Sequence, residues 1–149
     1  MTIASLLAKK GPKVVTVQPE QTIRQALALL AEHNIGALVT VDNAHRPIGI
    51  LSERDVVRAA VRDEDVFTRT VSALMTRNVI VAVPQDDLET VSRTMTDNRI
   101  RHLPVVDQGR LVGIISIGDV LKAQRDRYQG EVETLQIELT EEHGRPAHG

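Results

Sequence analysis

The sequence predicts an α+β fold made of two copies of one strand–helix–strand–strand–helix unit. The first observation is a repeated turn, since residues 49–55 (Gly-Ile-Leu-Ser-Glu-Arg-Asp) return as residues 113–119 (Gly-Ile-Ile-Ser-Ile-Gly-Asp). The second is a Val-rich segment ending at a proline, residues 14–19, which returns as residues 79–84. A unit this small leaves much of its apolar face exposed when it is alone. The two copies should therefore pack together as one folding unit.

The first copy follows an N-terminal helix within residues 1–10, which Gly11-Pro12 should end. Residues 14–17 are β-branched and predict a strand. The next helix carries Ile23, Ala26, Leu27 and Leu30 on one face and ends at His33-Asn34. The remaining elements are a buried strand, a second strand paired with it in a hairpin, and a helix, at residues 37–41, 48–51 and 55–61.

The second copy repeats this order after a polar connector. We expect a helical lead-in, a strand, a helix, a hairpin of two strands and a last helix, at residues 71–75, 79–83, 88–98, 103–106, 111–115 and from 120 onward. The chain then divides into an N-terminal segment, a first repeat, a linker, a second repeat, a helical extension and a disordered tail, at residues 1–12, 13–62, 63–70, 71–123, 124–141 and 142–149.

The last helix is longer than its counterpart in the first copy. Its apolar stripe follows heptad steps, with Arg125 in the one polar slot, and comprises Leu121, Tyr128, Val132, Leu135 and Leu139. Together with the other flanking helices, the stripe would expose more apolar surface than soluble monomers usually do, so we expect a homodimer. Two arrangements stay open, because the helix either contacts the partner or folds back on its own module.

Composition excludes several classes of protein. The 149 residues are 42% hydrophobic and carry a formal charge of −2, with no Trp and no Cys. The chain lacks the excess of basic residues that duplex DNA binding requires and the aromatic side chains on which single-stranded nucleic acid stacks. Without cysteine it can have neither a catalytic thiol nor a zinc–thiolate site. No apolar run approaches the ~20 residues of a membrane helix and no signal-like segment opens the chain, so we expect a soluble cytoplasmic protein.

The duplicated unit resembles a tandem pair of cystathionine beta-synthase (CBS) domains, called a Bateman module. The resemblance covers about residues 14–122 and rests on the two Gly-x-x-Ser-x-x-Asp turns, the strands that end at Pro19 and Pro84, and residues 103–107 (Leu-Pro-Val-Val-Asp). The first copy departs at Val39, where such domains commonly carry proline. The resemblance implies two CBS-type β-α-β-β-α repeats packed with pseudo-twofold symmetry, and two clefts that each accept an adenine nucleotide.

The turn aspartates mark one site in each cleft, because the resemblance implies that they bind ribose hydroxyls. The first cleft is expected to contain Ser52, Arg54, Asp55, Asn78, Val79 and Ile100. The second cleft is expected to contain Lys13, Val14, Ile35, Ala37, Arg101, His102, Pro104, Ser116, Gly118 and Asp119. The phosphate-contacting pair Arg101-His102 replaces Gly36-Ala37 of the first copy, so the sequence predicts unequal clefts with the stronger one at Asp119.

A purely structural role is the alternative for each of these residues. Ser52 and Ser116 suit helix N-caps, and an aspartate in the first turn favours the helix dipole by about 0.3–1 kcal/mol. The residues expected near adenine are also ordinary core and loop residues, while Arg101 and Arg54 also suit a solvated surface. The duplication and the resemblance favour ligand binding.

No catalytic motif is present in the sequence. There is no nucleophile with an adjacent base, no metal-ligand spacing and no phosphate-binding glycine loop. We therefore expect no enzyme, no required cofactor and no metal, but a regulatory module that binds AMP, with ATP or NADH as further candidates, and acts on an unknown effector protein. The alternative is a structural dimerisation module whose clefts are empty or bind S-adenosylmethionine or nucleic acid.

Overall fold

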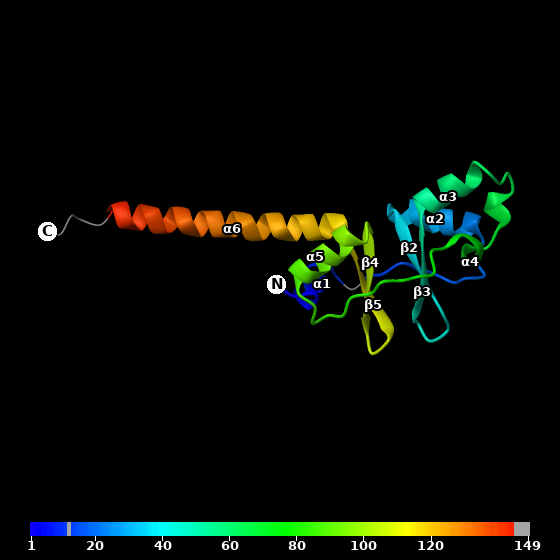
Figure 1. The fold of residues 1–149 in the computed structure, drawn as a ribbon, viewed down its shortest axis with the longest axis horizontal. Helices are drawn as coiled ribbons and strands as arrows, with labels where there is room; N and C mark the ends of the chain where they lie inside the picture. Colours follow the sequence, from blue (N-terminus) through cyan, green and yellow to red (C-terminus); the bar gives the residue numbers. More distant parts are fainter. Residues whose placement is uncertain (12, 145–149) are drawn as a thin grey trace.

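The computed structural model describes residues 1–144 except residue 12, and it has the expected α+β fold (Figure 1). The first half contains α1 Ile3–Lys10, β1 Thr16–Val17, α2 Ile23–His33, β2 Ala37–Val41, β3 Pro47–Ser52 and α3 Glu53–Ala60. The short helix η1 Val66–Thr68 lies in the connector. The second half contains α4 Val71–Leu74, α5 Leu88–Asp97, β4 His102–Asp107, β5 Arg110–Ser116 and α6 Ile117–Gly144.

Each half is built around an antiparallel hairpin. In the first half β2 pairs with β3, and β1 adds in parallel to β2. In the second half β4 pairs with β5. Both hairpins shift register at equivalent places, between Thr40 and Val41 and between Val105 and Val106. The two copies therefore share even their irregularities, as a duplication predicts.

Two of the expected strands are shorter in the structure. The first, expected over residues 14–17, is reduced to Thr16–Val17. The other, expected over residues 79–83, is a single parallel bridge from Ala82 to Val105. Ala82 donates to the Pro104 carbonyl at 2.9 Å and accepts from the Val106 amide at 2.8 Å, while Ile80, Val81 and Val83 stay about 40% exposed. One β-branched run is not sufficient for a strand where the chain contacts its neighbour at only one residue.

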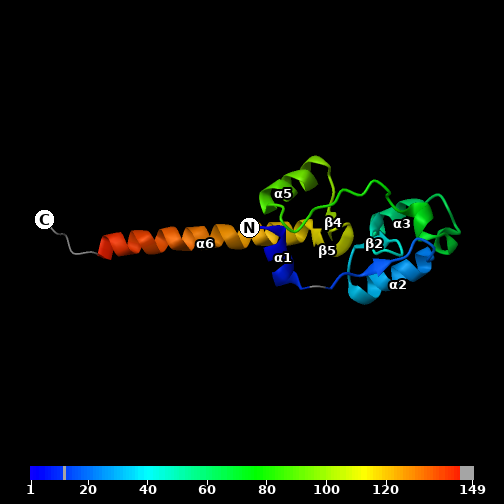
Figure 2. The same cartoon turned by 90° about the horizontal axis from the view of Figure 1, so that it is seen from below.

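The helices that precede the repeats cross over between them. Ile3 and Leu6 of α1 are buried in the core of the second repeat, next to residues such as Leu88. Val71 and Met75, at α4, are buried in the core of the first repeat. Figure 2 shows α1 beside β5 and α6 rather than beside α2. The N-terminal segment is therefore an integral part of the second repeat, which the sequence did not reveal.

Matching backbone contacts fix the two crossed helices. The Ala4 amide donates to the Pro84 carbonyl at 2.8 Å, and the Ser72 amide donates to the Pro19 carbonyl at 2.9 Å. The first glycine of each repeated turn, Gly49 or Gly113, lets a side chain from the crossed segment pack directly against the strand. A Cβ at Gly113 would lie 2.6 Å from the Leu7 side chain, and one at Gly49 would collide with Met75. The glycines in the turn motif thus serve packing rather than the turn.

A third apolar cluster joins the two repeats. Val39 and Val41 from β2 pack with Leu111 from β5, and Val14 and Ile114 lie against them. The Leu111 amide also donates to the carbonyl of His45 in the β2–β3 turn, at 2.9 Å. The hairpins of the two halves therefore contact each other directly, and the clefts lie on either side of this contact.

Thr40 in β2 is fully buried, and its hydroxyl finds no hydrogen-bond partner among the described residues. An unsatisfied buried hydroxyl costs about 1–3 kcal/mol, whereas valine has nearly the same shape. Thr40→Val should therefore raise the free energy of unfolding by about 1 kcal/mol in urea denaturation. The matched control is Val105→Thr at the equivalent position of the second repeat, which should lower it. A loss of stability in Thr40→Val would mean that the hydroxyl is hydrogen-bonded in solution.

The connector between the repeats is not merely a solvated linker. Its Val66 is buried, with 1% of its surface exposed, and its Phe67 ring lies 5.4 Å below the Arg24 guanidinium of α2. A cation over an aromatic face is favourable by about 0.5–1 kcal/mol at an exposed site. These contacts hold the predicted linker, residues 63–70, against the first repeat.

Helix α6 continues without a break from the second repeat and projects from the module as a single rod (Figure 1). The helix reaches Gly144, so the disordered tail expected from residue 142 does not begin there, and residues 145–149 lie outside the described residues. Among the helices of the described residues, none combines the length and apolar character that crossing a bilayer requires.

Candidate functional site

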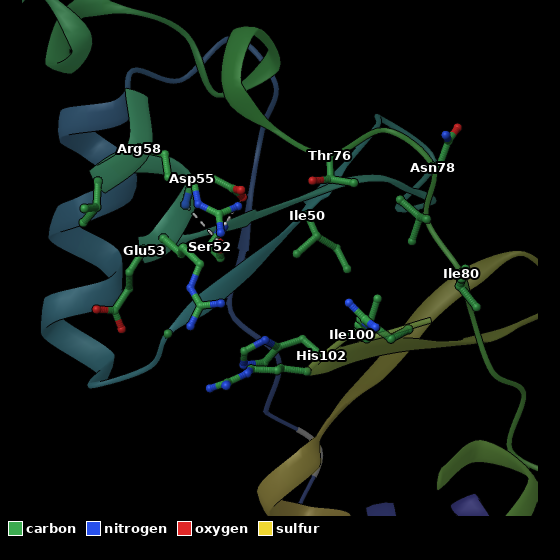
Figure 3. A pocket seen from close by; sticks show the side chains of 16 residues that line it. Ile50, Ser52, Glu53, Asp55, Arg58, Thr76, Asn78, Ile80, Ile100 and His102 are labelled. Atoms are coloured by element: carbon green, nitrogen blue, oxygen red, sulfur yellow. Dashed lines mark hydrogen bonds between the residues drawn. The ribbon is translucent and has the colours of Figure 1, made fainter. Parts of the chain in front are cut away.

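Two clefts open between the repeats, one at the start of each helix that follows a repeated turn. The first cleft, of about 680 Å³, lies at the start of α3 and is closed on its other side by residues 76–80 and the start of β4 (Figure 3). The second cleft, of about 510 Å³, lies between the end of α1, the end of α2 and the Ser116 turn. Cavities of this size match small-molecule sites.

The repeated turns form the same capping box in both clefts. The Asp55 amide donates to Ser52 Oγ at 3.2 Å, and the Ser52 amide donates to Asp55 Oδ2 at 2.9 Å. In the second repeat the Asp119 amide donates to Ser116 Oγ at 3.1 Å and the Ser116 amide donates to Asp119 Oδ2 at 2.9 Å. The spacing Ser-x-x-Asp therefore begins each helix, as predicted. It holds Asp55 on the wall of the first cleft, whereas in the second cleft the wall contains Ser116 but not Asp119.

Every residue predicted for the first cleft lies on its wall. These residues are Ser52, Arg54, Asp55, Asn78, Val79 and Ile100. Figure 3 shows Ser52 and Asp55 on one side, with Asn78 and Ile80 across the cavity and Ile100 and His102 below. Ser52, Arg54 and Asp55 were expected from the repeated turn, whereas the resemblance to CBS domain pairs implied Asn78, Val79 and Ile100.

The first cleft also contains cations that the sequence did not assign to it. Arg58 lies one helical turn after Arg54 on α3, and Arg99 and Arg101 flank Ile100. The Arg54–Arg58 spacing of four residues was a visible signal, because such residues share a helix face. Arg101 was expected in the second cleft, but it lines the first. With His102, four arginines therefore surround a cavity whose wall has the acids Glu53 and Asp55.

The second cleft receives only part of its predicted set. Lys13, Ile35, Ala37, His102 and Ser116 line it. Val14 instead packs in the cluster between the hairpins, Pro104 is buried within β4, and neither Gly118 nor Asp119 is on the cavity wall. Further wall residues that the sequence did not assign are Lys10, Val15, Glu32, His33, Gly36 and Ile114. Thr76 lines the first cleft rather than the second.

Lys10 at the end of α1 forms an ion pair with Asp119, the turn aspartate of the second repeat. Its Nζ donates to Asp119 Oδ2 at 2.6 Å and to the Ile114 carbonyl at 2.7 Å. Burial raises the pKa of Asp119, but the hydrogen bonds from Lys10 and Ser116 outweigh it, so the pKa lies below its ordinary value. Among the described residues Asp55 has no such ion pair, so the two repeated aspartates differ in whether a cation already contacts them.

His102 lies at the boundary of the two clefts and lines both. Burial lowers its pKa, and the positive charges of Lys10 and Arg101 lower it further, against the opposing effect of Asp119 and Glu53. The imidazole is therefore more often neutral at pH 7 than an exposed histidine. A negative charge that entered either cleft would raise this pKa, because it favours the charged imidazolium.

Comparison with known proteins accounts for both halves of the chain. The family model for the CBS domain matches twice, at residues 9–62 and 71–126. A relative from Bacillus subtilis, the CBS domain-containing protein YhcV, is 38% identical over 109 residues, which are 72% of this chain and 76% of YhcV. An inosine-5'-monophosphate dehydrogenase from Methanocaldococcus jannaschii is 35% identical over 113 residues, but the match is 75% of this chain and only 22% of that enzyme.

Solved structures show the same arrangement. A CBS-domain containing protein from Agrobacterium tumefaciens superposes with a TM-score of 0.79 and 41% identity, over 83% of this chain and 99% of that one. The CBS domain pair of protein MJ0100, solved in complex with 5'-methylthioadenosine and S-adenosyl-L-methionine, superposes with a TM-score of 0.76 and 27% identity, over 85% of this chain and 98% of that one. The chain therefore belongs to the CBS domain family, as a tandem pair of CBS domains.

Proposed function

We propose that this chain is a regulatory module that binds an adenine nucleotide, with the first cleft as the stronger site, and transmits its occupancy to a partner protein. The observation that carries the proposal is the wall of the first cleft. It joins an aspartate at a helix start with four arginines and His102 around one cavity. A nucleotide needs both features, an acceptor for its ribose hydroxyls and cations for its phosphates.

The helix start provides the ribose site in this proposal. Asp55 Oδ2 already accepts from the Ser52 amide, and its other oxygen can accept from a ribose hydroxyl. Asp55 is partly buried and lies on the cavity wall, so it is accessible to a ligand. The dipole of α3 also favours an anion near its first turn, where the Glu53 amide donates to the Gly36 carbonyl and the Asp55 amide to Ser52 Oγ.

The arginines would hold the phosphates. A guanidinium can bind a phosphate with two parallel hydrogen bonds, which makes it well suited to this group. Arg54 and Arg58 approach from α3, whereas Arg99 and Arg101 approach from the segment before β4. Phosphates between these two groups would bridge the two repeats, so occupancy would alter how the repeats sit against each other. This provides a physical route from binding to a partner.

The comparisons support the adenosine part of the ligand. Protein MJ0100 is described in complex with two compounds, and both contain adenosine. The surplus of arginines in this chain favours a ligand that also carries phosphate, which is why we propose AMP first and ATP or NADH next. S-adenosylmethionine lacks phosphate and would leave the arginines unpaired.

Titration calorimetry with AMP, ATP, NADH, adenosine and S-adenosylmethionine tests the proposal. We expect AMP or ATP to bind at least tenfold more tightly than adenosine, and a ligand at 100 times its dissociation constant to stabilise the fold by about 2.7 kcal/mol. Tighter binding of S-adenosylmethionine than of AMP would reject the phosphate assignment. If none of the five compounds binds, the structural dimerisation module becomes the better interpretation.

The pKa of His102 makes the proposed binding pH-dependent. His102 is largely neutral in the free protein, because burial and its cationic neighbours lower its pKa, and a bound phosphate would raise that pKa. Binding should thus take up a proton, and affinity for AMP should increase as the pH falls from 7.5 towards 6.5. Calorimetry in buffers of different ionisation enthalpy measures this uptake. In the His102→Gln variant, the proton uptake that remains should come only from the titration of AMP itself. An unchanged proton uptake in that variant would exclude His102 as the group that takes up the proton.

A further inference from the structure

Helix α6 extends well beyond the second repeat to which it is attached. Its first turns are attached to α5, since Gln124 donates to Ser92 at 3.3 Å and Arg127 lies 3.6 Å from Glu89. The family match ends at residue 126, and beyond it the helix continues to Gly144. Both views show this part as a straight rod that leaves the module (Figures 1 and 2). The extension is thus an addition to the CBS pair.

An isolated helix of this kind is only marginally stable in water, because most helical stability in proteins comes from packing of an apolar face. The extension carries such a face. Leu121, Tyr128 and Leu135 recur every seven residues with 59%, 67% and 58% of their surface exposed, and Val132 lies between the last two. Seven-residue recurrence with an intermediate apolar residue is the pattern of a two-stranded coiled coil. The occupant of this face is therefore expected to be another helix.

The charges along α6 are separated by sign. The segment from residue 122 to residue 127 contains Lys122, Arg125 and Arg127 with only Asp126 as an acid. The segment from residue 131 to residue 141 contains no base and four acids, Glu131, Glu133, Glu138 and Glu141. A helix with positive charges close to the module and negative charges towards its C-terminal end complements a copy of itself that runs in the opposite direction.

We infer that α6 pairs with α6 of a second copy of this chain as an antiparallel two-stranded coiled coil. Antiparallel pairing sets the basic segment of each helix beside the acidic segment of the other and buries the two stripes against each other. Parallel pairing would instead set the acidic segment of each helix beside the acidic segment of the other, where charges of the same sign repel. The inference goes beyond nucleotide binding and does not depend on it, because no residue of the stripe lines either cleft.

Distances between spin labels distinguish the two directions. The chain has no cysteine, so Lys122→Cys, Gln129→Cys and Gln136→Cys each provide a single labelling site on one side of α6. In a parallel pair, the label-to-label distance in the dimer is the same at all three sites. In an antiparallel pair the three distances cannot all be equal, because each step of seven residues changes the axial offset between the two labels by about 20 Å, which is about 10 Å on each helix. Equal distances, or no measurable distance between labels, would overturn the inference.

Sedimentation equilibrium of the full chain tests the stripe itself. Leu135→Glu places a charge in the proposed contact, and we expect it to raise the dissociation constant for self-association at least tenfold. Thr134→Glu adds the same charge next to it but off the stripe, and should leave that constant within twofold. The inference is wrong if both variants associate like the parent chain, or if both weaken association equally.

Discussion

Replacing Ile3 by alanine should lower the free energy of unfolding by about 2–5 kcal/mol, even though Ile3 is near the end of the chain. Its side chain is fully buried, and it packs in the core of the second repeat with residues such as Leu88 and Val120. Truncation would leave a cavity there that the surrounding sheet and helices can only partly fill. Chemical denaturation monitored by circular dichroism gives the change.

Val61→Ala is the matched control, because Val61 follows α3 with 83% of its surface exposed and should change stability by less than 0.5 kcal/mol. Amide hydrogen exchange shows which elements of the fold lose stability in the variant. In Ile3→Ala the loss of protection should be greater in α5 and β5 than in α2 and β3. A loss confined to α1 would show that this helix is docked but does not support the second repeat.

Replacing Asp55 by asparagine should weaken AMP binding by about 10- to 100-fold, because a hydrogen bond to a charged group contributes about 1.5–3 kcal/mol. Asparagine keeps the size of the side chain and one acceptor for the Ser52 amide, so the start of α3 should persist. Asp119→Asn should have the smaller effect, since Lys10 already occupies that carboxylate. Calorimetry on both variants compares the clefts.

A greater loss in Asp119→Asn would restore the order that the sequence predicted and would mean that Lys10 leaves Asp119 when ligand enters. Lys10→Met separates these cases. If the ion pair keeps the second cleft closed to ligand, this variant should gain a second binding event. Unchanged stoichiometry in Lys10→Met would show that the ion pair does not control access.

The parts of this protein that the sequence predicted are those set by short stretches of chain. A Ser-x-x-Asp turn carries its own hydrogen-bonding pattern, so Ser52 and Ser116 were correctly expected to cap the two helices. The helices expected from residues 55 and 120 begin slightly earlier, at Glu53 and Ile117. The end of α2 was equally local, since Asn34 adopts the left-handed conformation that ends helices. Half of the first cleft followed from the same turn, which contains Ser52, Arg54 and Asp55, and the other half was implied by the resemblance to CBS domain pairs.

The differences arise where distant parts of the chain meet. Arg101 and His102 are neighbours in sequence, but only His102 reaches both clefts, and which side of β4 a residue faces depends on pairing that the sequence does not encode locally. Lys10 was not assigned to any site, because its partner Asp119 lies at the far end of the second repeat. The strand expected over residues 79–83 was shortened for the same kind of reason, since the neighbouring strand contacts it only at Ala82.

The crossing of α1 and α4 between the repeats has a consequence for how the protein is made. A ribosome releases α1 first, yet the hydrophobic surface that covers Ile3 and Leu6 comes from residues 82–123. The first repeat can close as soon as α4 emerges, because its core needs nothing later than Met75. During synthesis α1 therefore remains undocked until nearly the whole module has been translated, and the first repeat is expected to fold ahead of the second.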